Sequence, residues 1–207
     1  MRHRRSVFGA AVLLAAACLL ESEKPTAGQA RLTTVAPAAR ADLAAWDSRV
    51  DSMLRQGELK VRLERPDTLI DGRSIEQLDQ YVDGVRVWNA GVSRQLDGQQ
   101  TVSMFGNLYD GVSIAVTPTV TAQQAKATIE QIGGTELGPD RTPRLHILPM
   151  DDGSFRLVWV GEIATTSDRL RLFIDARDGS VVRRNSLIDR QAPGGFVGHG
   201  LGVLGDS

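Results

Sequence analysis

The stretch that decides the fold is Gln80-Tyr81-Val82-Asp83-Gly84-Val85-Arg86-Val87-Trp88. In it, Asp83-Gly84 stands between two short runs that are rich in β-branched and aromatic residues. Glycine tolerates the positive φ that a tight hairpin turn requires, and aspartate can cap its own turn. The stretch therefore predicts a β-hairpin whose two strands continue outward on both sides.

Working outward, Asp-Gly pairs divide a strand-rich region. Six of them are present, at residues 71–72, 83–84, 97–98, 110–111, 152–153 and 178–179. Upstream of the hairpin, Leu59, Val61 and Leu63 alternate with charged residues until Pro66, which predicts a half-buried strand. Further strand-like runs lie at 80–82, 85–88, 91–96 and 101–105. Residues 58–118 are therefore predicted to form an antiparallel meander.

Two amphipathic helices accompany these strands. The first is indicated by apolar residues at three- and four-residue spacing: Leu43, Trp46, Val50, Met53 and Leu54, with Gly57 as its end. The second begins with the capping box of Thr121 and Gln124 and ends at Gly133-Gly134. Strand-like runs follow it at 144–148, 155–164, 169–175 and 180–184. The pattern predicts an α+β fold of two small units, each a helix plus an antiparallel sheet, with flexible ends.

The N-terminal segment predicts an export signal and a leader. Three arginines at positions 2, 4 and 5 precede the apolar run 7–20, which is shorter than the roughly 20 residues that span a bilayer. A short membrane anchor and lipidation at Cys18 are the alternatives. Cys18 is the only cysteine, which is consistent with a secreted, periplasmic or extracellular bacterial protein. We expect no stable membrane span, and we interpret residues 21–38 as a flexible leader.

No catalytic, cofactor-binding or metal-binding residues are predicted in this chain. A zinc hydrolase typically places His-Glu-x-x-His on one helix, but the three histidines, His3, His146 and His199, are far apart in the sequence. There is no Gly-x-Ser-x-Gly elbow for a nucleophilic serine. His146 lies in an apolar run, which favours a position at the edge of the core.

Basic residues gather near the end of the second unit, at Arg169, Arg171, Arg183, Arg184 and Arg190. A solvated strand face and a docking surface are both compatible with this pattern, and the solvated face is favoured. Because the net charge is −1 and no aromatic residues alternate with the arginines, nucleic acid is not an expected partner.

The segment from Leu59 to Gly111 resembles the fungalysin/thermolysin propeptide (FTP) domain. The resemblance rests on 81–88, on Gly91-Val92 and on 105–108, which match the family's "Q-x-Y-x-G-V-x-V-x-x-G" and "G-N-L" patterns. Its motif residues here are Tyr81, Gly84, Trp88, Gly106, Asn107 and Leu108. Residues 119–188 resemble the PepSY-type half of the same prosegments, through the capped helix, Trp159-Val160 and the run 173–182. The resemblance implies cystatin-like layers in both units.

The tail from Val197 to Asp206 resembles the start of a mature thermolysin-like enzyme, "V-G-x-G-x-G-V-L-G-D". This resemblance implies domains at 1–30 (signal and leader), 31–57 (linker and helix), 58–118 (FTP-like), 119–188 (PepSY-like) and 189–207 (junction and mature start). The candidate processing region is Asp189, Arg190, Gln191, Ala192, Pro193, Gly194, Gly195 and Phe196. Pro193-Gly194-Gly195 cannot continue a strand, so this segment is expected to be accessible to a protease.

The function that this resemblance implies is that of a prosegment, an intramolecular chaperone and inhibitor of a secreted thermolysin-like metalloprotease. Its partner would be the thermolysin-like catalytic domain, in cis or in trans, and zinc and calcium are expected only in that domain. Two alternatives stay open. The chain is the N-terminal part of a zinc metalloendopeptidase whose catalytic domain is missing from it, or it is a stand-alone PepSY-type binding or inhibitor module of the cell envelope.

The purified chain is expected to hydrolyse no protein substrate, with or without added zinc, because it lacks a residue set that could hold the metal. A casein-hydrolysis assay checks this expectation. Zinc-dependent cleavage that copurifies with the chain and is abolished by His146→Ala would contradict it.

Overall fold

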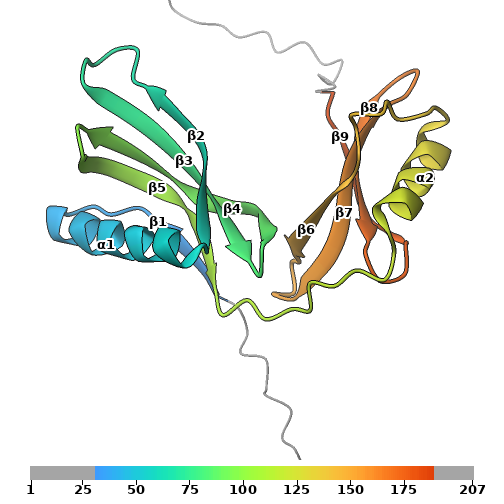
Figure 1. The fold of residues 1–207 in the computed structure, drawn as a ribbon, viewed down its shortest axis with the longest axis horizontal. Coiled ribbons are helices and arrows are strands. Elements are labelled where there is room, and N and C mark those ends of the chain that lie inside the picture. The colour runs from blue at the N-terminus through green and yellow to red at the C-terminus, as the bar shows by residue number, and fades with distance from the viewer. Residues whose placement is uncertain (1–30, 189–207) are drawn as a thin grey trace, which may run out of the picture.

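The computed structural model describes residues 31–188, which form two helices and a nine-stranded, mostly antiparallel sheet (Figure 1). The elements are β1 (Arg31–Val35), α1 (Arg40–Gln56), β2 (Leu59–Pro66), β3 (Arg73–Val82), β4 (Val85–Asp97), β5 (Gln100–Asp110), α2 (Ala122–Gly133), β6 (Arg144–Pro149), β7 (Phe155–Ala164), β8 (Arg169–Asp175) and β9 (Val181–Ser186). The α+β prediction is confirmed. The predicted export signal and the processing region lie outside the described residues.

The Asp83-Gly84 hairpin joins β3 to β4, as the sequence predicts. Asp83 has φ 47° and Gly84 has φ 79°, so both central residues are in the left-handed region. This combination is that of a type I′ turn, whose twist matches the twist of the paired strands. The predicted strands 85–88 and 91–96 are one long strand, β4, with a local kink at Asn89, where φ is 55°.

Two glycines allow the paired strands β3, β4 and β5 to approach one another closely. A Cβ on Gly91 would lie 2.1 Å from the carbonyl oxygen of Leu78, and one on Gly106 would lie 2.2 Å from that of Gly91. Neither distance is compatible with a side chain. The Gly91 and Gly106 of the sequence motif are therefore required by close backbone approach.

Helix α1 packs on the first half of the sheet, which comprises β1–β5. Two residues of its apolar stripe, Val50 and Met53, are buried. They form one cluster with the strand residues Leu59, Leu78, Val92, Met104 and Leu108. The helix ends at Gly57, whose φ of 76° places it in the left-handed C-cap conformation. The motif residue Leu108 is fully buried in this cluster, while Asn107 accepts a hydrogen bond from the Thr34 hydroxyl.

A charged network also joins α1 to the strands. The Arg94 side chain, which is 11% exposed, donates to Glu76 at 2.5 Å, to Asp51 at 2.9 Å and to Asp47 at 3.2 Å. Glu76 is similarly shielded from solvent, at 12% exposed. A shielded guanidinium needs such partners, because leaving either charge unpaired would cost several kcal/mol. The network sets the rotation of α1 over the sheet.

Helix α2 packs on the second half of the sheet, β6–β9. Thr121 and Gln124 form the predicted capping box at its start. The helix buries Ala125 and Ile129 against strands β7 and β8. The segment before it is held by Trp159, whose indole nitrogen donates to the carbonyl oxygen of Val120 at 2.7 Å.

The two halves share one sheet through a short parallel contact between β4 and β6. Only two residue pairs form it within the described chain, Arg86 with His146 and Val87 with Ile147. The two units that the sequence predicts are thus continuous across this contact, which we call the seam. Figure 1 shows β4 and β6 meeting between the two halves, with α1 and α2 on the outer sides.

Two local predictions were wrong. The leader assigned to residues 21–38 includes strand β1, which pairs with β5 from Arg31 opposite Asp110 to Val35 opposite Gly106. In β2, only Leu59 is buried, while Val61 and Leu63 are 49% and 39% exposed. The register shifts between Val61 and Leu63, which breaks the period of two on which the half-buried prediction depended.

Gly91→Ala should lower the free energy of unfolding by about 1–3 kcal/mol, the range for an overpacked site, because its Cβ would collide with rigid backbone. Urea denaturation measures the change. Gly138→Ala is the matched control: its Cβ would meet nothing within 4 Å, so it should stay within about 0.5 kcal/mol of the parent chain. Equal stability of the two variants would contradict the close approach.

Candidate docking surface

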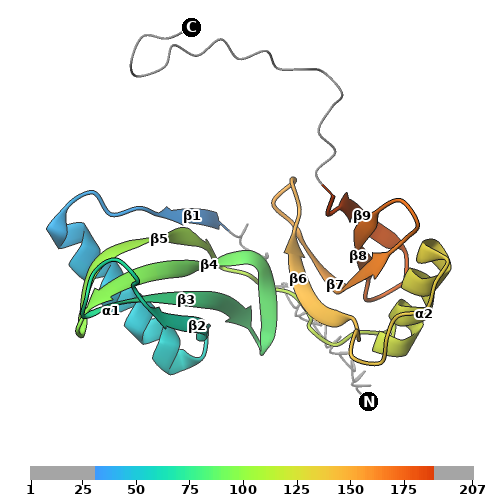
Figure 2. The same cartoon turned by 90° about the horizontal axis from the view of Figure 1, so that it is seen from above.

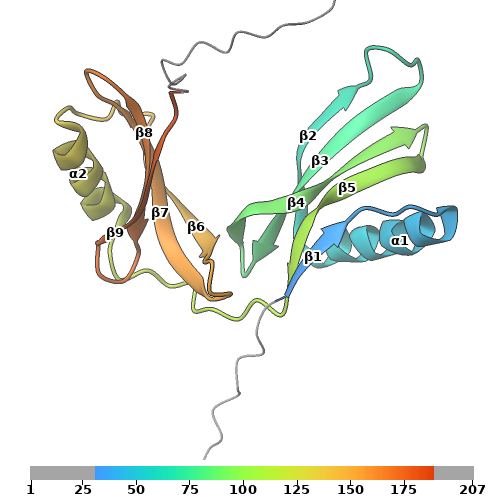
Figure 3. The same cartoon turned by 180° about the vertical axis from the view of Figure 1, so that it is seen from behind.

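One face of the sheet is covered by the two helices, and the opposite face, which we call the helix-free face, is not. In Figure 2 the strands of the first half lie in front of α1, while Figure 3 shows α1 and α2 on the outer sides of the two halves. Side chains alternate between the two faces along each strand. The helix-free face is therefore made by the residues that alternate with the buried clusters under α1 and α2.

In the first half, a row of side chains crosses four strands of this face. Leu63 is opposite Gln77, Gln77 is opposite Ser93, and Ser93 is opposite Phe105. Phe105 alternates with buried Met104 and is 65% exposed. A large exposed aromatic side chain beside polar neighbours is a common anchor of protein interfaces.

Asp79 ties the first half of the face to the seam. Its carboxylate, 9% exposed, accepts from Arg86 at 2.8 Å and from Arg62 at 3.2 Å. Arg86 lines two hollows of the face, one of about 400 Å³ over the first half and one of about 440 Å³ over the second. The two hollows therefore meet at this arginine. The motif residues Gly106 and Asn107 line the first hollow.

Trp88 holds the seam on the helix-free side. Its ring packs edge-on against Phe173, with centroids 4.9 Å apart, and against His146 at 5.3 Å. The Arg171 guanidinium lies 5.2 Å from the ring centroid. Trp88 is half-buried, and its ring joins the two halves of the sheet. Its place in the motif is explained by this contact.

His146 is buried beside Trp88, consistent with the predicted position at the edge of the core. Its Nδ1 lies 3.0 Å from the carbonyl oxygen of Arg144, which can only accept, so Nδ1 carries the proton. Burial lowers the pKa of His146 below the ordinary value of 6.5, and the charges of Arg86 and Arg144 act in the same direction. The hydrogen bond to Arg144 and the charge of Asp79 oppose this shift. The neutral imidazole is the form that fits the seam.

The arginines near the end of the chain separate onto two faces. Arg171 is opposite Glu162, and Arg183 is opposite Phe173, so both lie on the helix-free face. Arg184 is opposite Leu172, which packs under α2, and so lies on the other face. Arg190 lies outside the described residues.

Glu162 binds two of these arginines. It accepts from Arg171 at 2.6 Å and from Arg169 at 2.8 Å. Burial acts against the charged form, but these hydrogen bonds hold the pKa of Glu162 below its ordinary value. Glu162 is therefore ionised at neutral pH and orients both guanidinium groups. The sequence favoured a solvated strand face for these arginines. Arg184 lies on such a face, whereas Arg169 and Arg171 belong to a structured surface.

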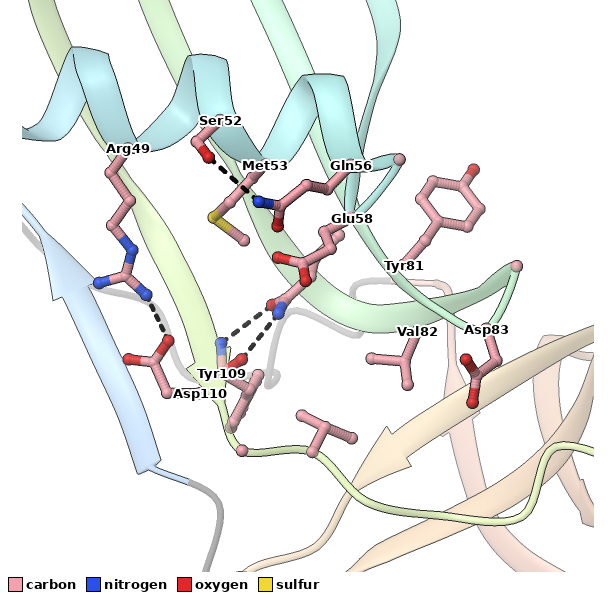
Figure 4. Close-up of a pocket in the computed structure, with 15 residues that line it drawn as sticks. Arg49, Ser52, Met53, Gln56, Glu58, Tyr81, Val82, Asp83, Tyr109 and Asp110 are labelled. Atoms are coloured by element: carbon pink, nitrogen blue, oxygen red, sulfur yellow. Dashed lines mark hydrogen bonds and ion pairs between the residues drawn. The ribbon is translucent and has the colours of Figure 1, made fainter.

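A third pocket, of about 750 Å³, lies between the end of α1, the β3–β4 hairpin and the end of β5 (Figure 4). Arg49 forms an ion pair with Asp110 in it, and Gln80 bonds the backbone nitrogen and oxygen of Tyr109. The motif residues Tyr81 and Gly84 line this pocket. Within residues 31–188 no group of histidine, cysteine or carboxylate side chains is arranged to hold a metal ion.

The motif residues of the sequence therefore do not converge on one site. Tyr81 and Gly84 are at the hairpin, and Trp88 is at the seam. The remaining three, Gly106, Asn107 and Leu108, are part of β5. Sequence reasoning missed Asp79, Arg86 and Glu162, which organise the helix-free face. The available signal was a charged residue inside or next to a predicted strand, and it does not reveal which charges meet.

Comparison with known proteins gives a distant match. The chain is 27% identical over 157 residues to the thermostable neutral protease NprT of Geobacillus stearothermophilus, a thermolysin-like protease. The match covers 65% of this chain and 28% of that protease, so the chain spans well under a third of its length. No family model matches.

Among solved structures, the Bacillus megaterium YpeB C-terminal domain is similar at a TM-score of 0.36 and 15% identity, over 75% of this chain and 68% of that one. In the described part of the chain, neither helix has the length and apolar character needed to cross a membrane.

The stability of the seam should fall in mild acid because of His146. The unfolded chain, with a histidine pKa near 6.5, binds the proton more readily than the folded chain does. The contribution of His146 to the free energy of unfolding should therefore be complete above this pKa. It should decrease as the pH falls from this value toward the lower pKa of the folded chain.

Urea denaturation between about pH 7.5 and about pH 5 measures this dependence. His146→Gln should flatten it, and the other two histidines, unchanged in both proteins, cancel in the comparison. The same slope in the parent chain and the variant would contradict the prediction.

Proposed function

We propose that this chain is the prosegment of a secreted thermolysin-like metalloprotease and that it binds the catalytic domain through the helix-free face. The observation that carries the proposal is that face: it continues across both halves of the sheet and presents the exposed Phe105 and two hollows that meet at Arg86. The distant similarity to a thermolysin-like protease supports the choice of partner.

A rigid, preformed surface suits both tasks of such a prosegment. If the face binds the near-native catalytic domain and not its unfolded chain, it stabilises the folded domain by mass action. The same contact inhibits the enzyme when it covers the substrate cleft. The charged network of Arg94 and the seam at Trp88 hold the face in shape before the partner arrives, which lowers the entropy cost of binding.

The proposal includes processing within Asp189–Phe196. Strand β9 ends at Ser186 and pairs with β8 alone within the described sheet, so the chain leaves the fold at an edge strand. Arg183 of this strand is on the helix-free face, opposite Phe173. The junction therefore follows within a few residues of the proposed docking surface.

The proposal is tested by adding the purified chain to the refolding of a thermolysin-like catalytic domain and to the folded enzyme. We expect a higher yield of active enzyme on refolding and inhibition of peptide hydrolysis by the folded form. Phe105→Ser should raise the inhibition constant by about tenfold, as for the loss of an aromatic anchor.

Leu69→Ser is the matched control, because Leu69 is 91% exposed but lies in the loop between β2 and β3. It should leave inhibition unchanged. Failure of the parent chain to inhibit or to assist refolding would refute the proposal. Equal weakening by both variants would refute the assignment of the surface.

A further inference from the structure

The hollow of about 440 Å³ over the second half is strongly basic. It lies where β4 and β6 meet, and five arginines line it: Arg86, Arg141, Arg144, Arg169 and Arg171. Asp140 and Glu162 are the two carboxylates in its lining, which leaves a formal excess of three positive charges. His146, also in the lining, is held neutral by burial and does not add to this charge at neutral pH.

Three of the five arginines already have carboxylate partners. Arg86 binds Asp79, and Arg169 and Arg171 share Glu162. Arg141 and Arg144 are exposed, and neither forms an ion pair with any residue between 31 and 188. Their donors are therefore available to an incoming anion.

Trp88 gives the hollow an apolar wall. Its ring is fixed by Phe173 and His146, and Arg171 lies over it. An acidic side chain has a short aliphatic stem and a carboxylate that guanidinium groups bind through paired hydrogen bonds. The stem can lie against the indole while the carboxylate reaches Arg141 or Arg144.

We propose that this hollow binds an acidic side chain carried on a segment of the partner protein. Charge complementarity selects the anion, and the concave position at the junction of the two halves favours a protruding loop over a flat bilayer surface. The identification of the partner as a thermolysin-like catalytic domain rests on the proposed function. The inference that the bound side chain is acidic does not rest on it.

The test uses a fluorescein-labelled hexaglutamate peptide and the full chain, with binding measured by fluorescence anisotropy. We expect saturable binding that weakens as salt is raised, no binding of the matching hexaglutamine peptide, and a change in tryptophan fluorescence on binding. Arg141→Gln and Arg144→Gln should each raise the dissociation constant by about tenfold. Both variants should fold normally, because neither side chain forms a hydrogen bond or an ion pair with another residue of the described range 31–188.

Arg184→Gln is the control, since it removes the same charge from the opposite face of β9. It should leave binding of hexaglutamate unchanged. An equal loss in Arg184→Gln, or equal binding of hexaglutamine, would overturn the proposal. So would arginine-dependent binding of phosphatidylglycerol vesicles or of single-stranded oligothymidine that matches or exceeds binding of the peptide.

The protease assay separates this inference from the proposed function. Hexaglutamate binding that depends on Arg141 and Arg144, in a chain that inhibits no thermolysin-like enzyme, would support the acidic site and refute the prosegment function. Inhibition that is unaffected by either variant, with no hexaglutamate binding, would support the prosegment function and refute the acidic site.

Discussion

The structure depends on the parallel contact between β4 and β6, where two residue pairs join the halves into one sheet. Parallel neighbours cannot be linked by a tight turn, so the chain must cross over, and it does so through residues 98–143, which contain β5 and α2. The crossover is anchored where Thr119 and Val120 donate to the carbonyl oxygen of Ala176 and where Trp159 donates to Val120. Two residue pairs are too few to define the angle between the halves. The side-chain packing of Trp88 is therefore needed as well.

Charge is used differently on the two faces of the sheet. On the helix side, Arg94 is shielded and binds Asp47 and Asp51 of α1 and Glu76 of β3, so it serves the fold. On the helix-free side, Asp79 and Glu162 each hold two arginines in place at the surface. Partly exposed pairs such as those of Glu162 add little stability. Their effect is to orient guanidinium groups toward the hollows, which is a property of a binding surface.

Much of the local structure could be predicted from the sequence because its signals are local. The type I′ hairpin follows from Asp83-Gly84, and the start of α2 follows from the capping box at Thr121. Prediction failed where the pairing of a strand with its partner decides the outcome. Strand β1 has no apolar period and exists because β5 offers it a free edge. The predicted half-buried face of β2 is lost through a register shift against β3.

By itself the sequence determined the α+β class, both helices, the turns and the absence of a His-Glu-x-x-His motif from this chain. Only the tertiary structure decided which residues share a surface. Arg183 and Arg184 are neighbours in sequence, yet side-chain alternation sends them to opposite faces. Arg86 and His146 are 60 residues apart and pair at the seam. Composition and periodicity give information only about the strand to which a residue belongs. A docking surface, in contrast, forms where strands that are distant in sequence come together.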